Sequence, residues 1–309
     1  MSIEPGRFGM STRTVKAVDI EAVPGDPIAP PITPATTFHL GDPSDGLDFY
    51  GRASNPAWRQ LESALAGLEG AASALVFGSG MAAITATPIR HLDAPTPSCP
   101  GWTVRDVVAH TGAVHRVVAG TVAGRPVPFS ETDAPAGAAV LDWYDGQARA
   151  LLGALRSADP GALTTSAVGE QPVEFWFRRQ THEVAVHLWD IRHAYLGPNA
   201  DPIDPAVAAD GILEWAEFIA PSFVGRSGGI PEGLRGARLD LNDGDTVRRI
   251  LVTTDTVALA DADDPPGATI HGSTSDLLLA LWHRVPLSQL TVTGDGELAR
   301  QILDLVHAG

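Results

Sequence analysis

Residues 175–197 have the sequence FWFRRQTHEVAVHLWDIRHAYLG, and this stretch says most about the fold. We predict one helix over it, because Gly197 followed by a proline is typical of a helix C-terminus. Glu183 and His187 are four residues apart in the sequence, so they lie on one face of that helix. His182 and His187 are five apart and point in different directions, which excludes the two-histidine pattern of zincin metalloproteases.

A second predicted helix begins after the turn at Pro100 and Gly101. Thr103 and Asp106 are three residues apart and predict a capping box at its start. Valines then recur at helical spacing, at positions 104, 107, 108, 114, 117 and 118. His110 lies near the same face, so we expect its imidazole to point into the protein. A further helix is predicted from residue 138 to residue 157.

His110, Glu183 and His187 are the candidate ligands of a divalent metal ion. Two nitrogens and one carboxylate oxygen leave a fourth position open for water or substrate, which is typical of catalytic zinc sites. Asp190 follows His187 by three residues and is predicted to orient a ligand from behind. Each residue also has an ordinary alternative. An inward histidine is typical of a satisfied core residue, and Glu183 with His187 also suits a hydrogen-bonded pair on a solvated helix face.

Composition narrows the choice of partners and ligands. A formal charge of −16 argues against nucleic acid or an anionic membrane surface as the main partner. Cys99 is the only cysteine, so a metal must be held by histidine and carboxylate. Apolar runs such as residues 277–282 are far shorter than the roughly 20 residues that span a bilayer. The first ten residues lack a basic stretch followed by an apolar one, so we expect a cytoplasmic protein.

Alternating segments near the C-terminus predict a small mixed sheet with a layer of helices on it, like that of sterol-carrier-type domains. Strands are predicted at residues 238–241, 249–253, 257–260, 269–270 and 290–293, and helices at 205–219, 275–283 and 297–306.

Two stretches in the predicted metal-binding helices resemble a known family. SCPGWTVRDVVAH (98–110) and RRQTHEVAVHLWD (178–190) resemble the mycothiol-dependent maleylpyruvate isomerase family, whose metal domain is of the DinB four-helix type. In that family a W-x-x-x-D-x-x-x-H run and an H-E-x-x-x-H run bind a divalent metal, usually zinc. The matching positions are His110, Glu183 and His187. The resemblance extends to GSTSDLLLALWHRVPLSQLTVTGD (272–295), which is similar to the family's small C-terminal α/β domain.

The resemblance implies an α+β protein in which a DinB-like bundle precedes a sterol-carrier-like domain. It implies a metal-dependent and mycothiol-dependent isomerase or thiol (S-)transferase, acting on a small electrophilic substrate that bears a carboxylate. Arg284 matches an arginine that holds the acidic substrate; alternatively, it is a helix-end cation favoured by the macrodipole. Arg178 and Arg179 are further candidates for anion contacts.

The N-terminal part resembles a different family. FYGRASNPAWRQLESALAGLEGAASALVFGSGMAAITAT (49–87) is similar to the N-terminal quarter of the transsulfuration family of pyridoxal-phosphate (PLP) enzymes. In that family, the positions of Tyr50 and Arg52 reach the cofactor phosphate of a neighbouring subunit. Gly80 and Met81 match the turn whose backbone amides hold the same phosphate.

PLP chemistry by this chain alone is nevertheless not expected. The family's Schiff-base lysine lies well beyond this segment, and Lys16 is the only lysine in the chain. The four matching residues are then remnants with packing roles.

We therefore divide the chain into an incomplete PLP-enzyme-like segment (1–87), a metal-binding domain (88–222) and a C-terminal α/β domain (223–309). A DinB-type bundle needs a helix before the PGW motif, where this chain carries the PLP-like segment. Either residues 81–91 or a helix beginning at Asn55 replaces it, or the bundle is incomplete. Two alternatives to an enzyme follow: a non-catalytic or vestigial fusion protein, and an accessory segment that lends Tyr50 and Arg52 to a separate PLP enzyme.

Overall fold

The computed structural model describes residues 81, 84, 89–130, 133–260 and 264–306. The chain divides into two compact units, residues 1–78 and 79–309, and every described residue belongs to the second. The predicted features at Tyr50, Arg52 and Gly80, and the helix from Asn55, lie outside the described residues.

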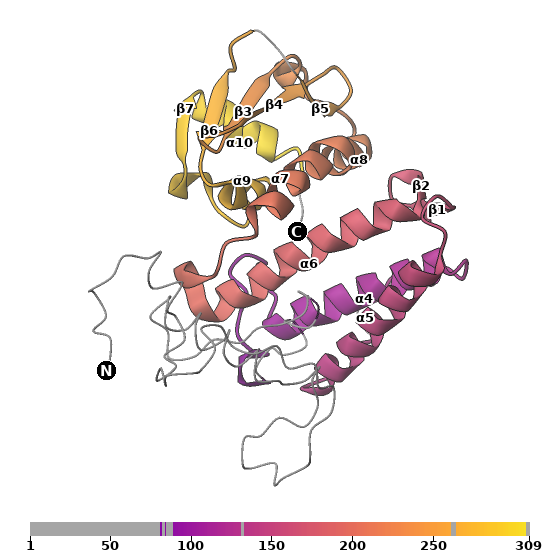
Figure 1. Ribbon diagram of the computed structural model, residues 1–309. Coiled ribbons are helices and arrows are strands. Elements are labelled where there is room, and N and C mark those ends of the chain that lie inside the picture. The colour runs from indigo at the N-terminus through magenta and orange to yellow at the C-terminus, as the bar shows by residue number, and fades with distance from the viewer. Residues whose placement is uncertain (1–80, 82–83, 85–88, 131–132, 261–263, 307–309) are drawn as a thin grey trace, which may run out of the picture. The chain divides into compact units, whose positions relative to one another are not determined.

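Three long helices form the first part of this unit. Helix α4 (Val104–Val122) packs against both α5 (Ala139–Ser157) and α6 (Val173–Leu196). Figure 1 shows the three helices running together. The three predicted helices are confirmed, and α6 ends directly before Gly197, which has a φ of 58°. Ile84 is fully buried in the same apolar cluster as the inward valines of α4, so residues before 88 contribute to this core.

The start of α4 is fixed by the predicted capping box. The Thr103 hydroxyl accepts from the backbone N–H of Asp106, and the Asp106 carboxylate accepts from the backbone N–H of Thr103 at 2.8 Å. Two amide groups at the open end of the helix are satisfied in this way.

Thr103→Ala is expected to lower the free energy of unfolding by about 1 kcal/mol, because the capping box is lost and the amide of Asp106 keeps only the Thr103 backbone carbonyl as an acceptor. Urea denaturation measures this change. Thr103→Ser retains the hydroxyl and should stay close to wild type; equal losses in both variants would contradict a capping role.

A short hairpin that the sequence did not predict joins α5 to α6. Strand β1 (Leu163–Ser166) pairs antiparallel with β2 (Gly169–Pro172), and Gly169 has a φ of 99° at the turn between them. The backbone N–H of Val173 donates to the Ala162 carbonyl at 2.9 Å. The hairpin thus supplies an acceptor at the start of α6, which has no side-chain cap.

The second part is a five-stranded mixed sheet with helices. Its strands are β3 (Arg238–Asn242), β4 (Val247–Val252), β5 (Val257–Leu259), β6 (Ala268–His271) and β7 (Thr291–Gly294). The order is β5-β4-β3-β6-β7, and β3 pairs with β6 in parallel while the other pairs are antiparallel. The predicted α+β architecture with a mixed sheet is confirmed.

The helices of this part are α7 (Pro205–Glu214), α8 (Ala220–Arg226), α9 (Thr274–Leu281) and α10 (Gly296–Leu303). A π turn (Trp215–Ile219) joins α7 to α8, so the helix predicted to end at residue 219 continues to Arg226. Short 3-10 turns lie at Ile89–His91, Gly197–Asn199, Glu232–Leu234 and Leu287–Gln289.

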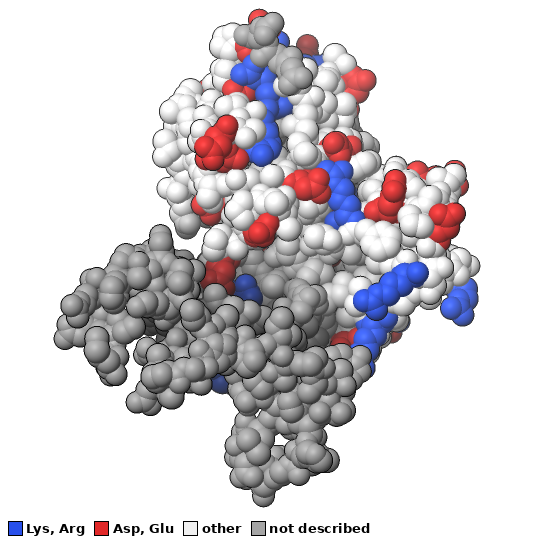
Figure 2. Space-filling view, in the orientation of Figure 1, with Lys and Arg blue, Asp and Glu red and all other residues white. Residues whose placement is uncertain are grey.

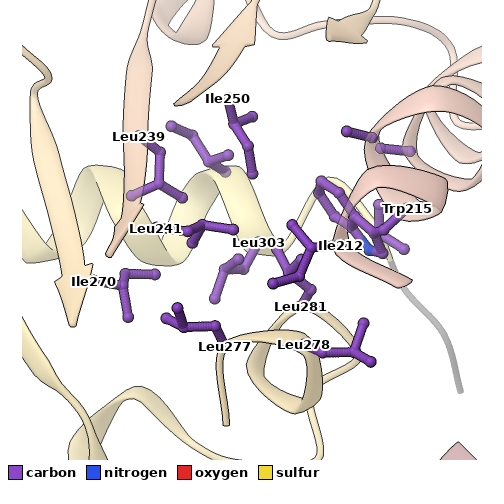
Figure 3. Close-up of a cluster of buried hydrophobic side chains, with 14 of the residues drawn as sticks. Ile212, Trp215, Leu239, Leu241, Ile250, Ile270, Leu277, Leu278, Leu281 and Leu303 are labelled. Carbon is purple, nitrogen blue, oxygen red and sulfur yellow. The ribbon is translucent and has the colours of Figure 1, made fainter. Parts of the chain in front are cut away.

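One apolar core lies between the sheet and these helices. Figure 3 shows Leu239 and Ile270 of the sheet, Trp215 of the π turn and Leu277 of α9 meeting in it. Val186 and Trp189 of α6 belong to the same cluster of buried residues. Apolar packing is therefore continuous from α6 into the C-terminal part, and it holds the two parts of this unit together.

The described surface carries acidic and basic residues side by side. Figure 2 shows the two signs interspersed on the visible face rather than a single basic patch. Within the part of the chain that the structure describes, no helix combines the length and apolarity needed to cross a membrane.

Candidate metal centre

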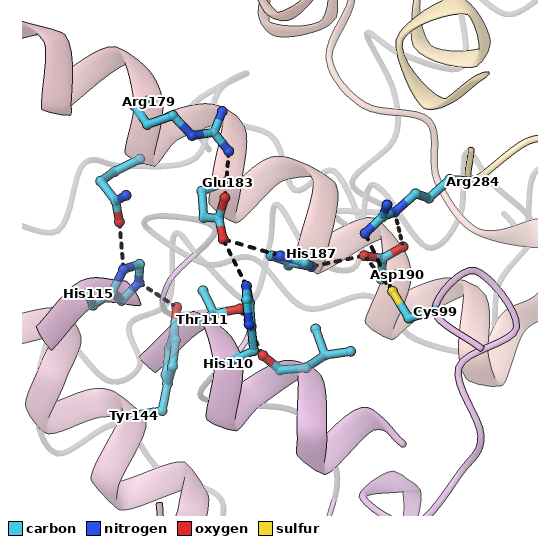
Figure 4. Close-up of polar contacts among 12 residues, drawn as sticks. Cys99, His110, Thr111, His115, Tyr144, Arg179, Glu183, His187, Asp190 and Arg284 are labelled. Atoms are coloured by element: carbon cyan, nitrogen blue, oxygen red, sulfur yellow. Dashed lines mark hydrogen bonds and ion pairs between the residues drawn. The ribbon is translucent and has the colours of Figure 1, made fainter. Parts of the chain in front are cut away.

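The candidate centre is built where α4 packs against α6. His110 lies on α4, and Glu183 and His187 lie on α6. Each offers one donor atom, and the three atoms all lie within 4.8 Å of one another. Figure 4 shows the three side chains pointing toward one another. Helical spacing alone pairs Glu183 with His187, and the packing of the helices adds His110.

One carboxylate oxygen lies at the middle of the group. Glu183 Oε1 is 3.6 Å from His110 Nε2 and 3.2 Å from His187 Nε2. The two imidazole rings are 5.2 Å apart and inclined at 70°. Imidazole nitrogen and carboxylate oxygen are ligand atoms that Zn²⁺ accepts, and such sites are tetrahedral with short metal–ligand distances. The donor set fits a divalent cation after small side-chain movements.

Two aromatic residues flank the His110 ring. The Trp102 and Phe129 rings lie 5.1 Å and 5.6 Å from it, centroid to centroid. Phe129 is 52% exposed although it touches the centre. The Arg116 guanidinium donates to the Pro128 carbonyl at 3.2 Å and so fastens the loop that carries Phe129. One side of the centre is thus apolar and accessible from solvent.

Asp190 lies behind His187 and is fully buried. Its Oδ2 is 2.9 Å from His187 Nδ1, and because a carboxylate only accepts, Nδ1 donates. This bond leaves Nε2 directed at Glu183, the arrangement that sets a ligand histidine's orientation. Burial alone would raise the pKa of Asp190, but the bond from His187 and the charge of Arg284 hold that pKa below its usual value.

The charged residues of the centre shift one another's pKa values. Burial alone would lower the pKa of His187, but the Glu183 carboxylate and the bond to Asp190 raise that pKa to about 9. Burial acts against ionisation of Glu183 as well, yet His187 and the hydrogen bond from His110 hold its pKa well below the usual range. The carboxylate is therefore ionised, as a metal ligand must be.

Arg179 supports Glu183 from the other side. It donates to Glu183 Oε2 at 2.5 Å and to Glu214 Oε2 on α7, also at 2.5 Å. Burial would lower the pKa of Arg179, but the two carboxylates raise it above its usual value. Both of the arginines suggested as anion contacts are thus engaged with carboxylates of the protein, since Arg178 pairs with Asp210 and Glu217.

Arg284 and Cys99 meet at Asp190. Arg284 Nε is 3.4 Å from Asp190 Oδ1, and Arg284 Nη2 is 3.5 Å from Cys99 Sγ. The thiol of Cys99 faces Asp190 Oδ2 at 3.6 Å. Burial, and then the Asp190 charge, raise the pKa of Cys99 to about 11, so the thiol stays protonated at neutral pH and is a poor nucleophile. No sequence pattern predicted this contact.

A buried polar cluster next to the centre was also missed. His115 is fully buried, with Nδ1 2.8 Å from Gln180 Oε1 and Nε2 3.4 Å from the Tyr144 hydroxyl. His115 lies among valines in the sequence, where an inward histidine has no distinguishing pattern. Burial lowers the pKa of His115 from 6.5 to about 4, so the ring is neutral in the folded protein.

Because of His115, the folded protein is therefore expected to lose stability as the pH is lowered. Below about pH 6.5 the unfolded chain takes up a proton at His115 that the folded chain does not bind until about pH 4. From pH 7 to pH 5 this residue alone should cost about 2 kcal/mol. Urea unfolding of wild type and His115→Gln at both pH values tests this, and an equal loss in the two proteins would exclude His115 as the cause.

Met81 is the described member of the predicted phosphate-binding remnants. It packs against apolar side chains of the helical part, in the clusters that contain Val107 and Leu151. Tyr50, Arg52 and Gly80 lie outside the described residues.

The N-terminal segment matches known proteins over a short stretch. Residues 11–97 match the family of Cys/Met metabolism PLP-dependent enzymes. A Streptomyces coelicolor protein named as a cystathionine gamma-lyase is 45% identical over 91 residues, which are 28% of this chain and 23% of that protein. The chain thus spans about a quarter of the length of that curated relative.

Two solved structures also align with part of the chain. The crystal structure of the mycothiol-dependent maleylpyruvate isomerase has 15% sequence identity and a TM-score of 0.45, and the alignment covers 65% of this chain and 83% of that one. The UbiJ-SCP2 ubiquinone synthesis protein has 17% identity and a TM-score of 0.22, with 34% of this chain and 92% of that one covered.

Models of one protein family match most of the described part of the chain. Residues 79–192 match the mycothiol maleylpyruvate isomerase N-terminal domain, and residues 206–301 match the C-terminal domain of the same family. The first match holds all three candidate ligands, and the second holds Arg284. From residue 79 onward the chain therefore belongs to the mycothiol maleylpyruvate isomerase family, while residues 11–97, which overlap the start of that region, match the family of Cys/Met metabolism PLP-dependent enzymes.

Proposed function

We propose that the chain is a metal-dependent and mycothiol-dependent isomerase or thiol transferase that acts on a small electrophilic substrate bearing a carboxylate. The observation that carries this proposal is the group of His110, Glu183 and His187, whose donor atoms lie within 4.8 Å of one another. The family match supports mycothiol as the thiol.

The donor set supports a catalytic metal rather than a structural one. Two imidazole nitrogens and one carboxylate oxygen would hold a zinc ion and leave a fourth position open. A bound zinc ion would lower the pKa of a thiol there, so that the thiolate is present at neutral pH.

Neighbouring residues orient two of the three candidate ligands. Asp190 accepts from His187 Nδ1 and leaves Nε2 facing the centre. Arg179 binds Glu183 Oε2 and leaves Oε1 facing the two histidines. The Trp102 and Phe129 rings beside His110 offer an apolar wall on the accessible side, where an electrophile can lie with less surrounding water.

The two proposed reactions share their first step. The thiolate sulfur forms a C–S bond with one carbon of the substrate's C=C double bond, and the π electron pair of that bond moves onto the conjugated carbonyl as an enolate. In an isomerisation, rotation about the resulting C–C single bond is followed by return of that electron pair and cleavage of the C–S bond, so the double bond re-forms and the thiolate is released unchanged. In a transfer, the α-carbon of the enolate instead takes a proton from water, the C–S bond persists and the product carries the thiol. Consumption of mycothiol therefore distinguishes the two.

Elemental analysis and a turnover assay on the full chain test the proposal. We expect about one zinc ion per chain, and turnover of maleylpyruvate or a related unsaturated acid that needs mycothiol and stops on chelation. Glutathione in place of mycothiol is the control for thiol specificity. A chain that takes up no zinc would exclude the metal centre and favour a non-catalytic fusion protein. Bound zinc without thiol-dependent turnover of these acids would exclude the proposed reactions.

The accessory role of the N-terminal segment stays a separate prediction. If Tyr50 and Arg52 serve a PLP enzyme, cofactor absorbance should appear only when a lysine-bearing partner is present, because a Schiff base needs an amine.

A further inference from the structure

Arg284 is held by its own neighbours from the C-terminal part. It follows α9, and its backbone N–H donates to the Leu279 carbonyl at 2.8 Å. His283, just before it, has a φ of 58°, a conformation that costs energy for a residue other than glycine. The His283 side chain lies 2.8 Å from the Val306 carbonyl, which keeps this turn in place. The direction of the Arg284 side chain is thereby set.

The guanidinium of Arg284 is buried, and each of its three nitrogens has a partner. Its side chain is 6% exposed. Its Nη1 donates to the Trp282 carbonyl at 2.7 Å, while Nε and Nη2 face Asp190 and Cys99. A substrate carboxylate bound by two parallel hydrogen bonds needs a free edge of the guanidinium. In the described structure that edge faces Asp190 and Cys99.

Asp190 connects this arginine to a candidate metal ligand. One carboxylate oxygen, Oδ2, accepts from His187, and the other, Oδ1, lies against Arg284 (Figure 4). A fully buried carboxylate is costly unless a cation accompanies it. Arg284, which lies 94 positions after Asp190 in the chain, supplies that positive charge.

We propose that Arg284 is a positioning residue, which holds Asp190 against His187 so that the C-terminal domain sets the metal affinity of the helical part. This inference rests on the proposed metal centre. It replaces the role expected from the family resemblance, in which Arg284 holds the carboxylate of the substrate.

Zinc affinity separates the two roles. The dissociation constant of zinc is measured by competition with a chromogenic chelator for wild type, Arg284→Met and Arg284→Lys, together with the melting temperature of each metal-free protein. Loss of a residue that orients a ligand typically weakens metal binding about 10–100-fold, which is the expectation for Arg284→Met. Arg284→Lys should recover part of this affinity, because the charge remains but the fork is lost. If Arg284→Met does not fold, the zinc affinity of Arg284→Lys tests the proposal instead.

Arg248→Met is the matched control. Arg248 also lies in the C-terminal part and pairs with Asp243 at 2.9 Å, with side chains 15% and 9% exposed. Its loss should lower the melting temperature and leave zinc affinity within about twofold, since it has no connection to a ligand. A fall in zinc affinity that merely followed stability would appear in this variant too and would overturn the proposal.

Steady-state kinetics complete the test. We expect Arg284→Met to lower kcat at limiting zinc and leave KM for the acidic substrate near that of wild type. Unchanged zinc affinity with a KM raised at least tenfold would overturn the proposal and return Arg284 to substrate binding. A wild-type chain that binds no zinc would instead overturn the proposed function itself, so the two failures are distinguishable.

Discussion

His187→Ala is expected to abolish stoichiometric zinc binding and, with it, thiol-dependent turnover. The variant removes one of three protein ligands, and a zinc site contributes about 10–16 kcal/mol in total, so the loss should weaken binding by more than about 100-fold. The same change frees the Asp190 carboxylate from its bond to Nδ1. Elemental analysis after dialysis and chelator competition both measure the effect.

His182→Gln is the control for this experiment. His182 lies on the same helix and is similarly buried, but its Nε2 is 2.8 Å from Asp210 Oδ2, away from the three candidate ligands. We expect it to lose some stability and keep its zinc. Equal loss of zinc in both variants would mean that the fold of α6, and not His187 itself, is responsible.

Arg179→Met is expected to lower the free energy of unfolding by about 3–5 kcal/mol, because it leaves the buried carboxylate of Glu214 without its cation and removes one of the cations beside Glu183. Glu183 and Glu214 have side chains that are only 12% and 2% exposed, and each accepts from Arg179 at 2.5 Å. Methionine fills similar space without a charge, so the loss reflects the missing charge. Urea denaturation of the metal-free protein measures it.

Two further variants test whether burial of the carboxylate partners explains the loss of stability in Arg179→Met. Adding Glu214→Gln to Arg179→Met should recover part of the stability, because the carboxylate that lost its cation is replaced by a neutral amide. Arg178→Met changes the neighbouring arginine, whose partners Asp210 and Glu217 are both 46% exposed. Its loss should cost no more than about 1 kcal/mol. Similar losses for the two arginines would contradict the importance that we assign to burial.

Local sequence patterns predicted the helices well. Thr103 and Asp106 mark the start of α4 through side chains that bond to nearby backbone, and Gly197 marks the end of α6 because it has no Cβ. The spacing of Glu183 and His187 likewise predicts that they share a face. Such features depend on residues within one or two turns, which is why they can be found without knowing the fold.

Contacts between distant segments were not predictable in this way. His110 was predicted as the third ligand from its inward-facing position on the helix and from the family resemblance, but that it meets Glu183 depends on the packing of α4 on α6. Arg179 meets Glu214 across 35 residues, and Arg284 meets Asp190 across 94. The periodicity of the sequence does not indicate which buried arginine contacts which buried carboxylate. The resemblance therefore singled out Arg284 in the sequence, while its neighbours required the structure.

The distance along the chain between Asp190 and Arg284 also orders events during synthesis. All three candidate ligands and Asp190 belong to α4 and α6, whereas Arg284 follows Asp190 by 94 residues. At ordinary rates of translation this interval is about 5 to 20 seconds. A nascent chain thus presents all three candidate ligands before the C-terminal domain has been made. Docking of that domain then brings Arg284 against Asp190 after the candidate ligands are already in place.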